Sequence, residues 1–403
     1  MNTYKSKTVV PFFKPSITDA EVDEVVDTLR SGWLTTGPKT KRFEKKFANY
    51  IGQSTAIAVN SCTAALHLSL EAIGVQRDDR VVVPTMTFAA TGEVVRYFGA
   101  KPLLVDCRPD DYNLDVDDAE RRIGQAVARG ERVVAIIPVH YGGQVCDVKG
   151  IQRLAAKYSL RIVEDAAHCC PAYYRDDAAS PWKSVGSDGD ISCYSFYANK
   201  TITTGEGGMA CTSNPELADR MRVMSLHGIS RDAWNRFSSE GSWYYEIVAP
   251  GFKYNMTDVA SALGIHQLRR ADEFRNQRRQ WAACYTEQLE EVDEIVLPTE
   301  QPNRKHSWHL YEIRLRFDHL TIERAEVIKQ LRERNITTSV HWMPLHMHPY
   351  YRETYGYAPE DYPVAASVYP GQITLPLFPG MTEEQVQHVA ASLKSILASN
   401  RLS

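Results

Sequence analysis

Between residues 56 and 196, short apolar runs alternate with longer segments of helical periodicity. The runs are rich in β-branched residues and comprise Ala56–Val59, Val81–Val83, Leu103–Val105, Val133–Val139, Ile162–Val163 and Ile191–Phe196. Helical periodicity is clearest in segments 63–73, 93–98 and 151–158. Wholly apolar short strands separated by helices are typical of a mainly parallel sheet that helices cover on both faces. Such sheets bind ligands beyond the carboxyl ends of their strands, so chemistry is expected there.

The rest of the chain predicts further helices and a second, smaller unit. Thr18 and Glu21 have capping-box spacing at the start of a helix. A long helical tract begins at Thr257 and runs towards Leu289. After a proline-containing break the pattern is strand, helix, strand and final helix, at 310–317, 322–334, 337–341 and 382–397. We therefore expect a large α/β domain over residues 1–265 and a smaller α+β domain over residues 266–403.

Composition excludes several classes of protein. The formal net charge is −4 without basic runs, which argues against nucleic acid as a partner. No stretch approaches the roughly 18 apolar residues that a membrane span requires. The N-terminus lacks the apolar region of a secretory signal, and the eight cysteines form no C-x-x-C pair. We therefore expect reduced thiols and a cytoplasmic location.

Two loops that follow predicted strands carry candidate ligand contacts. Ser61, Cys62 and Thr63 precede a helix, where free N–H groups and the helix dipole favour an anion. Taken alone, this loop is more simply an ordinary Ser/Thr N-cap. Phe88 ends the loop after Val83 and is placed to stack on a planar ligand, although a core phenylalanine is the simpler interpretation of that residue alone.

Two further loops carry ionisable groups. Asp165 follows an apolar strand directly, where a carboxylate stays ionised if it faces a cationic nitrogen. A helix N-cap for Asp165 and a packed ring for His168 explain these residues equally well. Lys200 lies among small and hydroxyl-bearing residues and is followed by Gly205, Gly207 and Gly208. Because a desolvated lysine shifts its pKa readily and forms Schiff bases, we favour a reactive lysine over a solvated one.

Together these loops offer a phosphate cradle, an aromatic platform, an acid for a pyridinium nitrogen and a Schiff-base lysine. The cofactor that uses all four is pyridoxal 5′-phosphate (PLP). No G-x-G-x-x-G follows the first strand, which sets aside a nicotinamide enzyme.

The chain also resembles a known family, the DegT/DnrJ/EryC1/StrS sugar aminotransferases. The resemblance spans nearly the whole length and rests on five segments: Ser31–Gly37, Glu164–His168, Ser195–Lys200, Thr204–Gly208 and Pro250–Asp258. It implies a fold-type I PLP aminotransferase, with a seven-stranded, mainly parallel sheet in the large domain. The segment from Gly251 to Asp258 looks most like enzymes that aminate C4 of a nucleotide-linked 4-keto sugar.

The resemblance also implies residue roles. Lys200 would form the Schiff base with PLP, Asp165 would pair with the pyridine nitrogen, and His168 would lie near the ring hydroxyl. Phe88 would stack on the ring. Cys62, Thr63 and Ser195 would bind the phosphate, and Asn255 would reach it from the neighbouring subunit of a homodimer. Family members often have Gly where this chain has Cys62.

The activity implied by the resemblance is transfer of an amino group from L-glutamate to C4 of the nucleotide keto sugar. Related dehydratases carry His in place of the lysine, so Lys200 favours transamination. Alternatives are a C3 sugar or cyclitol aminotransferase, an amino-acid transaminase, and a non-catalytic PLP-binding sensor or scaffold.

A histidine-rich segment begins at the end of the last predicted strand and contains His341, His346 and His348. Three histidines suggest a metal site, but Pro344 interrupts the run and it contains no Cys or carboxylate. We expect no metal here, and instead a loop at the mouth of the active site whose rings contact substrate. His306 and His309 would act in the same way.

Overall fold

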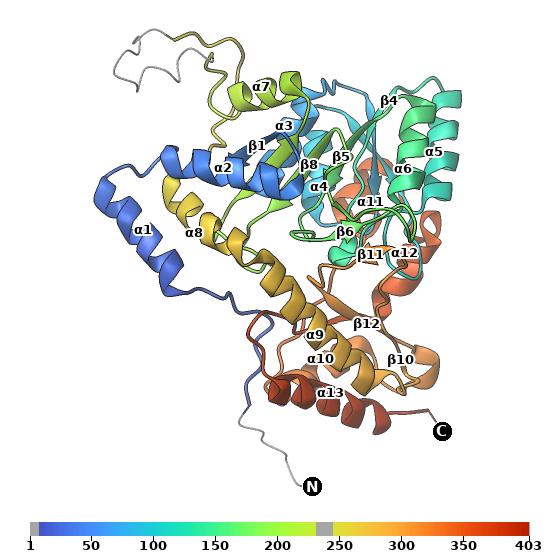
Figure 1. Ribbon diagram of the computed structural model, residues 1–403. Coiled ribbons are helices and arrows are strands. Elements are labelled where there is room, and N and C mark those ends of the chain that lie inside the picture. The colour runs from blue at the N-terminus through green and yellow to red at the C-terminus, as the bar shows by residue number, and fades with distance from the viewer. Residues whose placement is uncertain (1–7, 231–244, 403) are drawn as a thin grey trace.

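The structure is a computed structural model that describes residues 8–230 and 245–402. Its centre is a seven-stranded sheet in the order β1-β9-β8-β5-β4-β2-β3 (Figure 1). The strands are β1 (Thr55–Val59), β2 (Arg80–Pro84), β3 (Lys101–Val105), β4 (Val133–Ile136), β5 (Arg161–Asp165), β8 (Ile191–Ser195) and β9 (Gly208–Thr212). Four neighbouring pairs are parallel, and β9 runs antiparallel to both β1 and β8. The prediction of a mainly parallel seven-stranded sheet is confirmed.

Helices cover both faces of this sheet, as the apolar strands predicted. Val81 and Val83 pack in the core beneath α3 (Cys62–Ala72), α4 (Ala89–Arg96) and α7 (Pro215–Met224), whereas Val82 packs against α5 (Val116–Ala128) and α6 (Val148–Tyr158). Beside α5 and α6, the same face carries α2 (Pro38–Ile51) and α8 (Asp258–Arg269) over β1 and β9. Alternate side chains of one strand therefore enter opposite cores.

The first helix begins where its capping residues predicted. Helix α1 spans Asp19–Ser31, and the hydroxyl and the N–H of Thr18 both donate to the Glu21 carboxylate. Gly32 ends it in the left-handed region, with φ 73°. The helix packs against α8 rather than on the sheet, at the left of Figure 1.

Strand β9 has no counterpart in the prediction, which treats Gly205–Gly208 as a loop. All five of its residues are buried, and it is hydrogen-bonded on both sides. Its composition, Gly-Met-Ala-Cys-Thr, is poor in the β-branched residues that mark the other strands. Residues 208–212 therefore form a strand because they hydrogen-bond to β1 and β8, and not because their own side chains favour strand structure.

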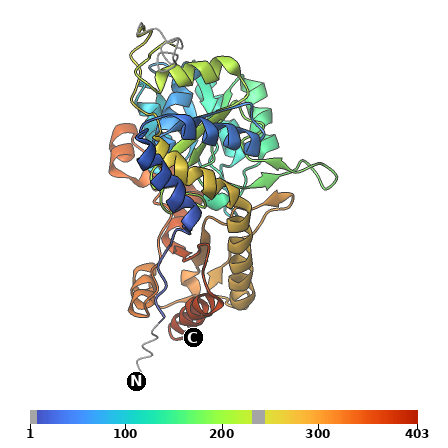
Figure 2. The same ribbon diagram turned by 60° about the vertical axis from the view of Figure 1, so that its left-hand side comes forward.

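Much of the chain after residue 270 forms a second body below the large sheet (Figure 2), whereas the segment from Leu345 to Val368 packs on the core of the large body. A three-stranded antiparallel sheet, β10 (Ile295–Val296), β12 (Tyr311–Leu315) and β13 (Gln372–Leu375), packs with α9 (Ala271–Leu289), α10 (Arg324–Glu333) and α13 (Glu383–Ala398). Val10, near the start of the chain, is buried in this core and pairs with Ile336. The long helical tract is interrupted at Arg270, between α8 and α9. The division at residues 265 and 266 remains a prediction.

The predicted strand over 337–341 is wrong. Ser339 makes one isolated bridge with Thr374 of β13, through backbone hydrogen bonds of 2.8 and 3.1 Å, and the pairing goes no further. His341 and Trp342, which follow, line the cavity described below and so leave the sheet. The remaining short elements are β6 (Tyr173–Tyr174), β7 (Lys183–Ser184) and β11 (Arg304–Lys305), which form a third sheet, and helices α11 (Pro349–Tyr355) and α12 (Pro363–Val368).

Candidate active site

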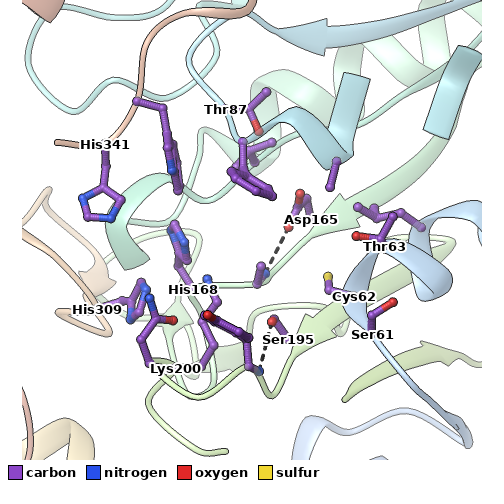
Figure 3. Close-up of a pocket in the computed structure, with 18 of the residues that line it drawn as sticks. Ser61, Cys62, Thr63, Thr87, Asp165, His168, Ser195, Lys200, His309 and His341 are labelled. Atoms are coloured by element: carbon purple, nitrogen blue, oxygen red, sulfur yellow. Dashed lines mark hydrogen bonds between the residues drawn. The ribbon is translucent and has the colours of Figure 1, made fainter. Parts of the chain in front are cut away.

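A cavity of about 340 Å³ opens at the carboxyl ends of β1, β2, β5 and β8 (Figure 3). Every predicted cofactor-binding residue except Asn255 lines it: Cys62, Thr63, Phe88, Asp165, His168, Ser195 and Lys200. The parallel strands bring these side chains together from segments more than a hundred residues apart, because their carboxyl ends meet at one edge of the sheet. His309 and His341 lie on the wall opposite Cys62 and Thr63 in this view.

The N-terminus of α3 forms one end of the cavity. Ser61 caps the helix by accepting a 3.1 Å hydrogen bond from the N–H of Ala64. The N–H groups of Cys62 and Thr63 precede the first intrahelical hydrogen bond and stay available for an anion. Cys62 is the first residue of the helix, and its backbone is not left-handed, so a non-glycine residue fits there. The N-cap is therefore present, and it leaves these N–H groups free to bind an anion, so the two interpretations of the sequence are compatible.

Glycine is required opposite this helix end. A Cβ on Gly208 would collide with the backbone of Ser61 and Cys62, and one on Gly207 would collide with the Thr204 hydroxyl and the Met256 side chain. The start of β9 therefore lies directly against the first turn of α3. Ser195, at the end of β8, accepts a 3.3 Å hydrogen bond from the N–H of Tyr197, and its own hydroxyl proton is left for a ligand.

Asp165 lies at the end of β5 and is almost fully buried. Its Oδ2 accepts a 2.8 Å hydrogen bond from the Thr91 hydroxyl, and its Oδ1 accepts one of 3.1 Å from the N–H of Ala167. Burial raises the pKa of the carboxyl, while these two hydrogen bonds and the charge of Lys200 oppose the rise. The effect of burial is larger than the opposing effects, so the ionised carboxylate is not fully stabilised by its protein neighbours. It is therefore suited to a cationic ligand atom, such as a pyridinium nitrogen.

His168 is held as a neutral hydrogen-bond donor. Its Nδ1 accepts a 3.2 Å hydrogen bond from the N–H of Gly142, so in the neutral ring the proton is on Nε2. The ring stacks on Trp342, with centroids 5.1 Å apart, and lies 4.3 Å from the ring of His309. Burial lowers the pKa of His168 well below its usual range, and the charge of Lys200 adds to the effect. The imidazole can therefore donate to an oxygen in the cavity at neutral pH.

Lys200 lies at the floor of the cavity in Figure 3. Burial lowers the pKa of its ammonium group to about 8, partly offset by the acidic groups of Cys62 and Asp165. Among the described residues, its Nζ has no hydrogen-bond or ion-pair partner. A lysine of this kind has a sizeable neutral fraction near pH 7–8, which is the nucleophilic form.

Phe88 is the N-cap residue of α4, four residues after the end of the buried strand β2, and is 59 % exposed, which is unusual for an aromatic ring beside a buried sheet. Its nearest aromatic neighbour is Trp342, at 6.3 Å and a tilt of 52°. The ring thus presents a free apolar face to the cavity, as a platform for a planar ligand would.

Asn255 lies outside the cavity. Its backbone bridges to Val59, its Nδ2 donates a 2.7 Å hydrogen bond to the Thr36 hydroxyl, and its Oδ1 accepts one from Lys253. Its predicted contact across a subunit interface stays a prediction.

Sequence reasoning missed Thr91 and the buried pair of His140 and Glu164. Thr91, in the first turn of α4, follows Thr87 by four residues, and their hydroxyls lie 2.8 Å apart, so this spacing was the available signal. His140 contacts Glu164 at 2.9 Å on the far side of β5, directly behind Asp165. No local pattern links residues 140 and 164, because their contact depends on the pairing of neighbouring strands.

The described part of the chain has no group of three or more His, Cys, Asp or Glu side chains arranged to hold a metal ion. None of its helices is both long and apolar enough to cross a membrane.

These groups fit PLP: an unpaired lysine, a buried acid, a histidine donor, an open aromatic face and a helix N-terminus surround one cavity. When bound, PLP supplies an aldehyde that links covalently to amines and a ring that accepts electrons. The fold and the site together define a PLP-dependent enzyme of fold type I.

Comparison with known proteins gives the particular family. The profile of the DegT/DnrJ/EryC1/StrS aminotransferase family matches residues 15–394. The chain therefore belongs to this family of PLP-dependent sugar aminotransferases. It is 47 % identical to protein MJ1066 of Methanocaldococcus jannaschii, over 97 % of this chain and 98 % of that protein. It is 41 % identical to the spore coat polysaccharide biosynthesis protein SpsC of Bacillus subtilis, over 96 % and 97 %.

A solved structure agrees with this assignment. Spr1654 from Streptococcus pneumoniae, described as a sugar aminotransferase, superposes in its PLP-form with a TM-score of 0.88 and 33 % identity. The match covers 97 % of this chain and 99 % of that chain.

Proposed function

We propose that this protein transfers an amino group from L-glutamate to C4 of a nucleotide-linked 4-keto sugar. The family membership and the solved sugar aminotransferase support a sugar acceptor. The similarity to SpsC supports a product that enters a polysaccharide. The segment Gly251–Asp258, which resembles that of C4 aminotransferases, supports C4 as the carbon that is aminated.

The single observation that carries the proposal is the unpaired Lys200 in the same cavity as Asp165. In the proposed mechanism the neutral Lys200 amine takes the proton from the α-carbon of the amino donor and returns a proton on the acceptor carbon in the second half-reaction. Asp165 holds a proton on the pyridine nitrogen, and Thr91 and the Ala167 N–H keep that carboxylate in place. His168 donates from Nε2 to the ring hydroxyl.

The remaining cofactor contacts have structural roles. The N–H groups of Cys62 and Thr63 and the hydroxyls of Thr63 and Ser195 bind the phosphate. Phe88 covers one face of the ring, and its exposed position supports that role.

The protein is proposed to act in the cytoplasm.

The visible spectrum of the purified protein tests the proposal. We expect a yellow absorbance band from the lysine-linked cofactor that bleaches on addition of L-glutamate and returns with the correct nucleotide keto sugar. Lys200→Ala, compared with Lys183→Ala as a surface control, should lose the band and turnover. A band that ignores glutamate and other amino donors would favour the non-catalytic sensor or scaffold, and return of the band with 3-keto sugars or keto cyclitols alone would favour those acceptors.

We further propose a homodimer in which Asn255 reaches the partner's phosphate site. Its position outside its own cavity supports this. Co-expression of Lys200→Ala chains with Asn255→Ala chains should restore one intact site in each mixed dimer, about a quarter of wild-type activity in an equal mixture. Activity no greater than the sum of the separate variants would contradict a contact between subunits.

A further inference from the structure

The small sheet presents a polar face towards the large sheet, because side chains alternate along its strands. Tyr311, Ile313 and Leu315 of β12 point into the small core, which leaves Glu312 on the other face. On β13, Ile373 and Leu375 are likewise in the core, which leaves Gln372 and Thr374 beside Glu312. Glu312 and Thr374 are direct cross-strand partners.

Glu312 is a buried carboxyl surrounded by hydrogen-bond donors. The Tyr141 hydroxyl lies 2.9 and 2.8 Å from the two carboxyl oxygens and also contacts the backbone carbonyl of His341, so these acceptors share one proton. Gln372 Nε2 donates to Oε1 at 2.6 Å. The Thr374 hydroxyl donates to Oε2 at 3.3 Å. The glutamate is 4 % exposed and has no ion pair within the residues that the structure describes.

Thr374 connects this carboxyl to the active-site cavity. Its hydroxyl lies 2.7 Å from Nδ1 of His341, whose ring lines the cavity (Figure 3). The other ring nitrogen, Nε2, has no partner among the described residues. The connection therefore runs from Glu312 through Thr374 to His341, and from there to whatever binds in the cavity.

A hydroxyl has one proton, so the protonation state of Glu312 sets the direction of the whole chain. When Glu312 is ionised, Thr374 donates to Oε2 and must accept from His341, which then carries its proton on Nδ1. When Glu312 is protonated, Oε1 still accepts from Gln372, so the new proton is on Oε2. Thr374 is then released to donate to Nδ1, and the His341 proton moves to Nε2.

We propose that Glu312 is a positioning residue whose proton decides whether His341 presents a lone pair or an N–H group to the cavity. The state with a lone pair accepts a hydrogen bond from a hydroxyl of the bound substrate, and the state with an N–H donates to its oxygen. The effect on turnover rests on the proposed sugar acceptor, whereas the change in the ring itself does not.

The charges around both groups allow this change near neutral pH. Burial raises the pKa of Glu312 to about 8, against the hydrogen bonds from Tyr141, Thr374 and Gln372 and the charge of Arg324. Tyr112 is the other titratable neighbour on that side. Burial lowers the pKa of His341 to about 3, and Lys200 adds to the effect. Lys200, His168 and His309 face it across the cavity. His341 thus stays neutral, and the position of its proton changes rather than its charge.

Nitrogen-15 NMR of cofactor-loaded protein with ¹⁵N-labelled histidine tests the proposal, because protonated and unprotonated ring nitrogens have well separated shifts. The His341→Gln variant identifies the signals of this residue. In the wild type we expect the protonated nitrogen to change from Nε2 to Nδ1 as the pH rises from about 6.5 to about 9.5. Glu312→Gln, whose amide donates as the protonated acid does, should keep the proton on Nε2 throughout.

Two further variants separate this role from a merely structural one. In Thr374→Val, the position of the His341 proton should no longer change between about pH 6.5 and about pH 9.5, because the link to Glu312 is lost. Glu294→Gln, a control at another buried carboxylate of the same body, should leave them as in the wild type. With the acceptor sugar, Glu312→Gln should remove a pH-dependent change of about two- to tenfold in KM, the size expected for one hydrogen bond.

His341 signals that are the same in wild type and Glu312→Gln at every pH would overturn the proposal, whichever substrate the enzyme uses. If the His341 proton changes position with pH in the wild type and not in Glu312→Gln, but no keto sugar is turned over, only the proposed function is contradicted.

Discussion

Thr91 donates a 2.8 Å hydrogen bond to Oδ2 of Asp165, from a helix to the end of a strand 74 residues further along the chain. The contact opposes the rise in the pKa of the carboxyl that burial causes. It also leaves Asp165 only limited freedom to rotate, since Ala167 holds the other oxygen.

Replacing Thr91 by valine, which has nearly the same shape, should therefore destabilise the ionised form of Asp165 that faces the pyridine nitrogen. A hydrogen bond to a charged group contributes about 1.5–3 kcal/mol, which corresponds to a loss of about ten- to a hundredfold in kcat. Steady-state kinetics of Thr91→Val measure this, with Thr87→Val as the matched variant one hydrogen bond further away. Equal kcat for Thr91→Val and wild type would exclude the contact from catalysis.

Replacing Asp165 by asparagine should keep much of the cofactor binding and lose most of the rate. The amide has nearly the shape of the carboxyl but cannot hold the pyridine nitrogen protonated, so we expect a decrease of at least about 10²-fold in kcat. Cofactor content by absorbance and single-turnover kinetics separate binding from rate. An Asp165→Asn enzyme with near-normal turnover would remove the assigned role.

The reactivity of Lys200 should depend on pH in a way that surface lysines do not. In protein freed of its cofactor, the neutral amine predominates above pH 8 and disappears as the pH falls below it, because the pKa is lowered to about 8. Labelling with an amine-reactive reagent, followed by peptide mass spectrometry, should show a midpoint near pH 8.

Lys39 is the internal control for this experiment. Burial pulls the pKa of Lys39 down, but hydrogen bonds to Asp27 and Glu24 keep it above its usual value. Its labelling should still be rising at pH 10. The same midpoint for both lysines would contradict the assigned environment of Lys200.

Packing behind the site should be sensitive to loss of one aromatic ring. Phe47 is fully buried and makes edge contacts with Phe43, Tyr194 and Phe196, at centroid distances of 5.0 to 5.9 Å. Phe47→Ala should reduce the free energy of unfolding by about 3–5 kcal/mol, measured by urea denaturation. Val127→Ala, at an exposed position on α5, should cost little, and similar losses in both variants would be inconsistent with this packing.

The sequence predicted the large sheet well because its strands carry their own signal. Val81–Val83 and Leu103–Val105 are apolar on both faces, and each lies within the observed strand. The antiparallel β9 was missed because Gly208 and Ala210 have no strand propensity of their own, and only the neighbours β1 and β8 make them a strand. The prediction of a strand over 337–341 was wrong for the opposite reason, because there the local propensity is high and the tertiary structure overrides it. The β-branched residues of this segment favour a strand, but the chain turns to bring His341 and Trp342 to the cavity.

The candidate site was predictable where one residue follows a strand end, as with Asp165, or stands out from its surroundings, as with Lys200. It was not predictable where a role depends on a distant contact. Thr91 needs Asp165, and Glu312 needs both Thr374 and Tyr141, and no local pattern connects these positions.

The position of Val10 affects the order in which the chain can complete its fold during synthesis. Its N–H and carbonyl pair with Asn335 and Thr337, and its side chain is fully buried in the core of the C-terminal body. The start of the chain leaves the ribosome first, yet it must wait for those residues before this core can close. An engineered fragment that begins after residue 10 would therefore leave a gap in the last part of the protein to be made, far from the deletion in sequence.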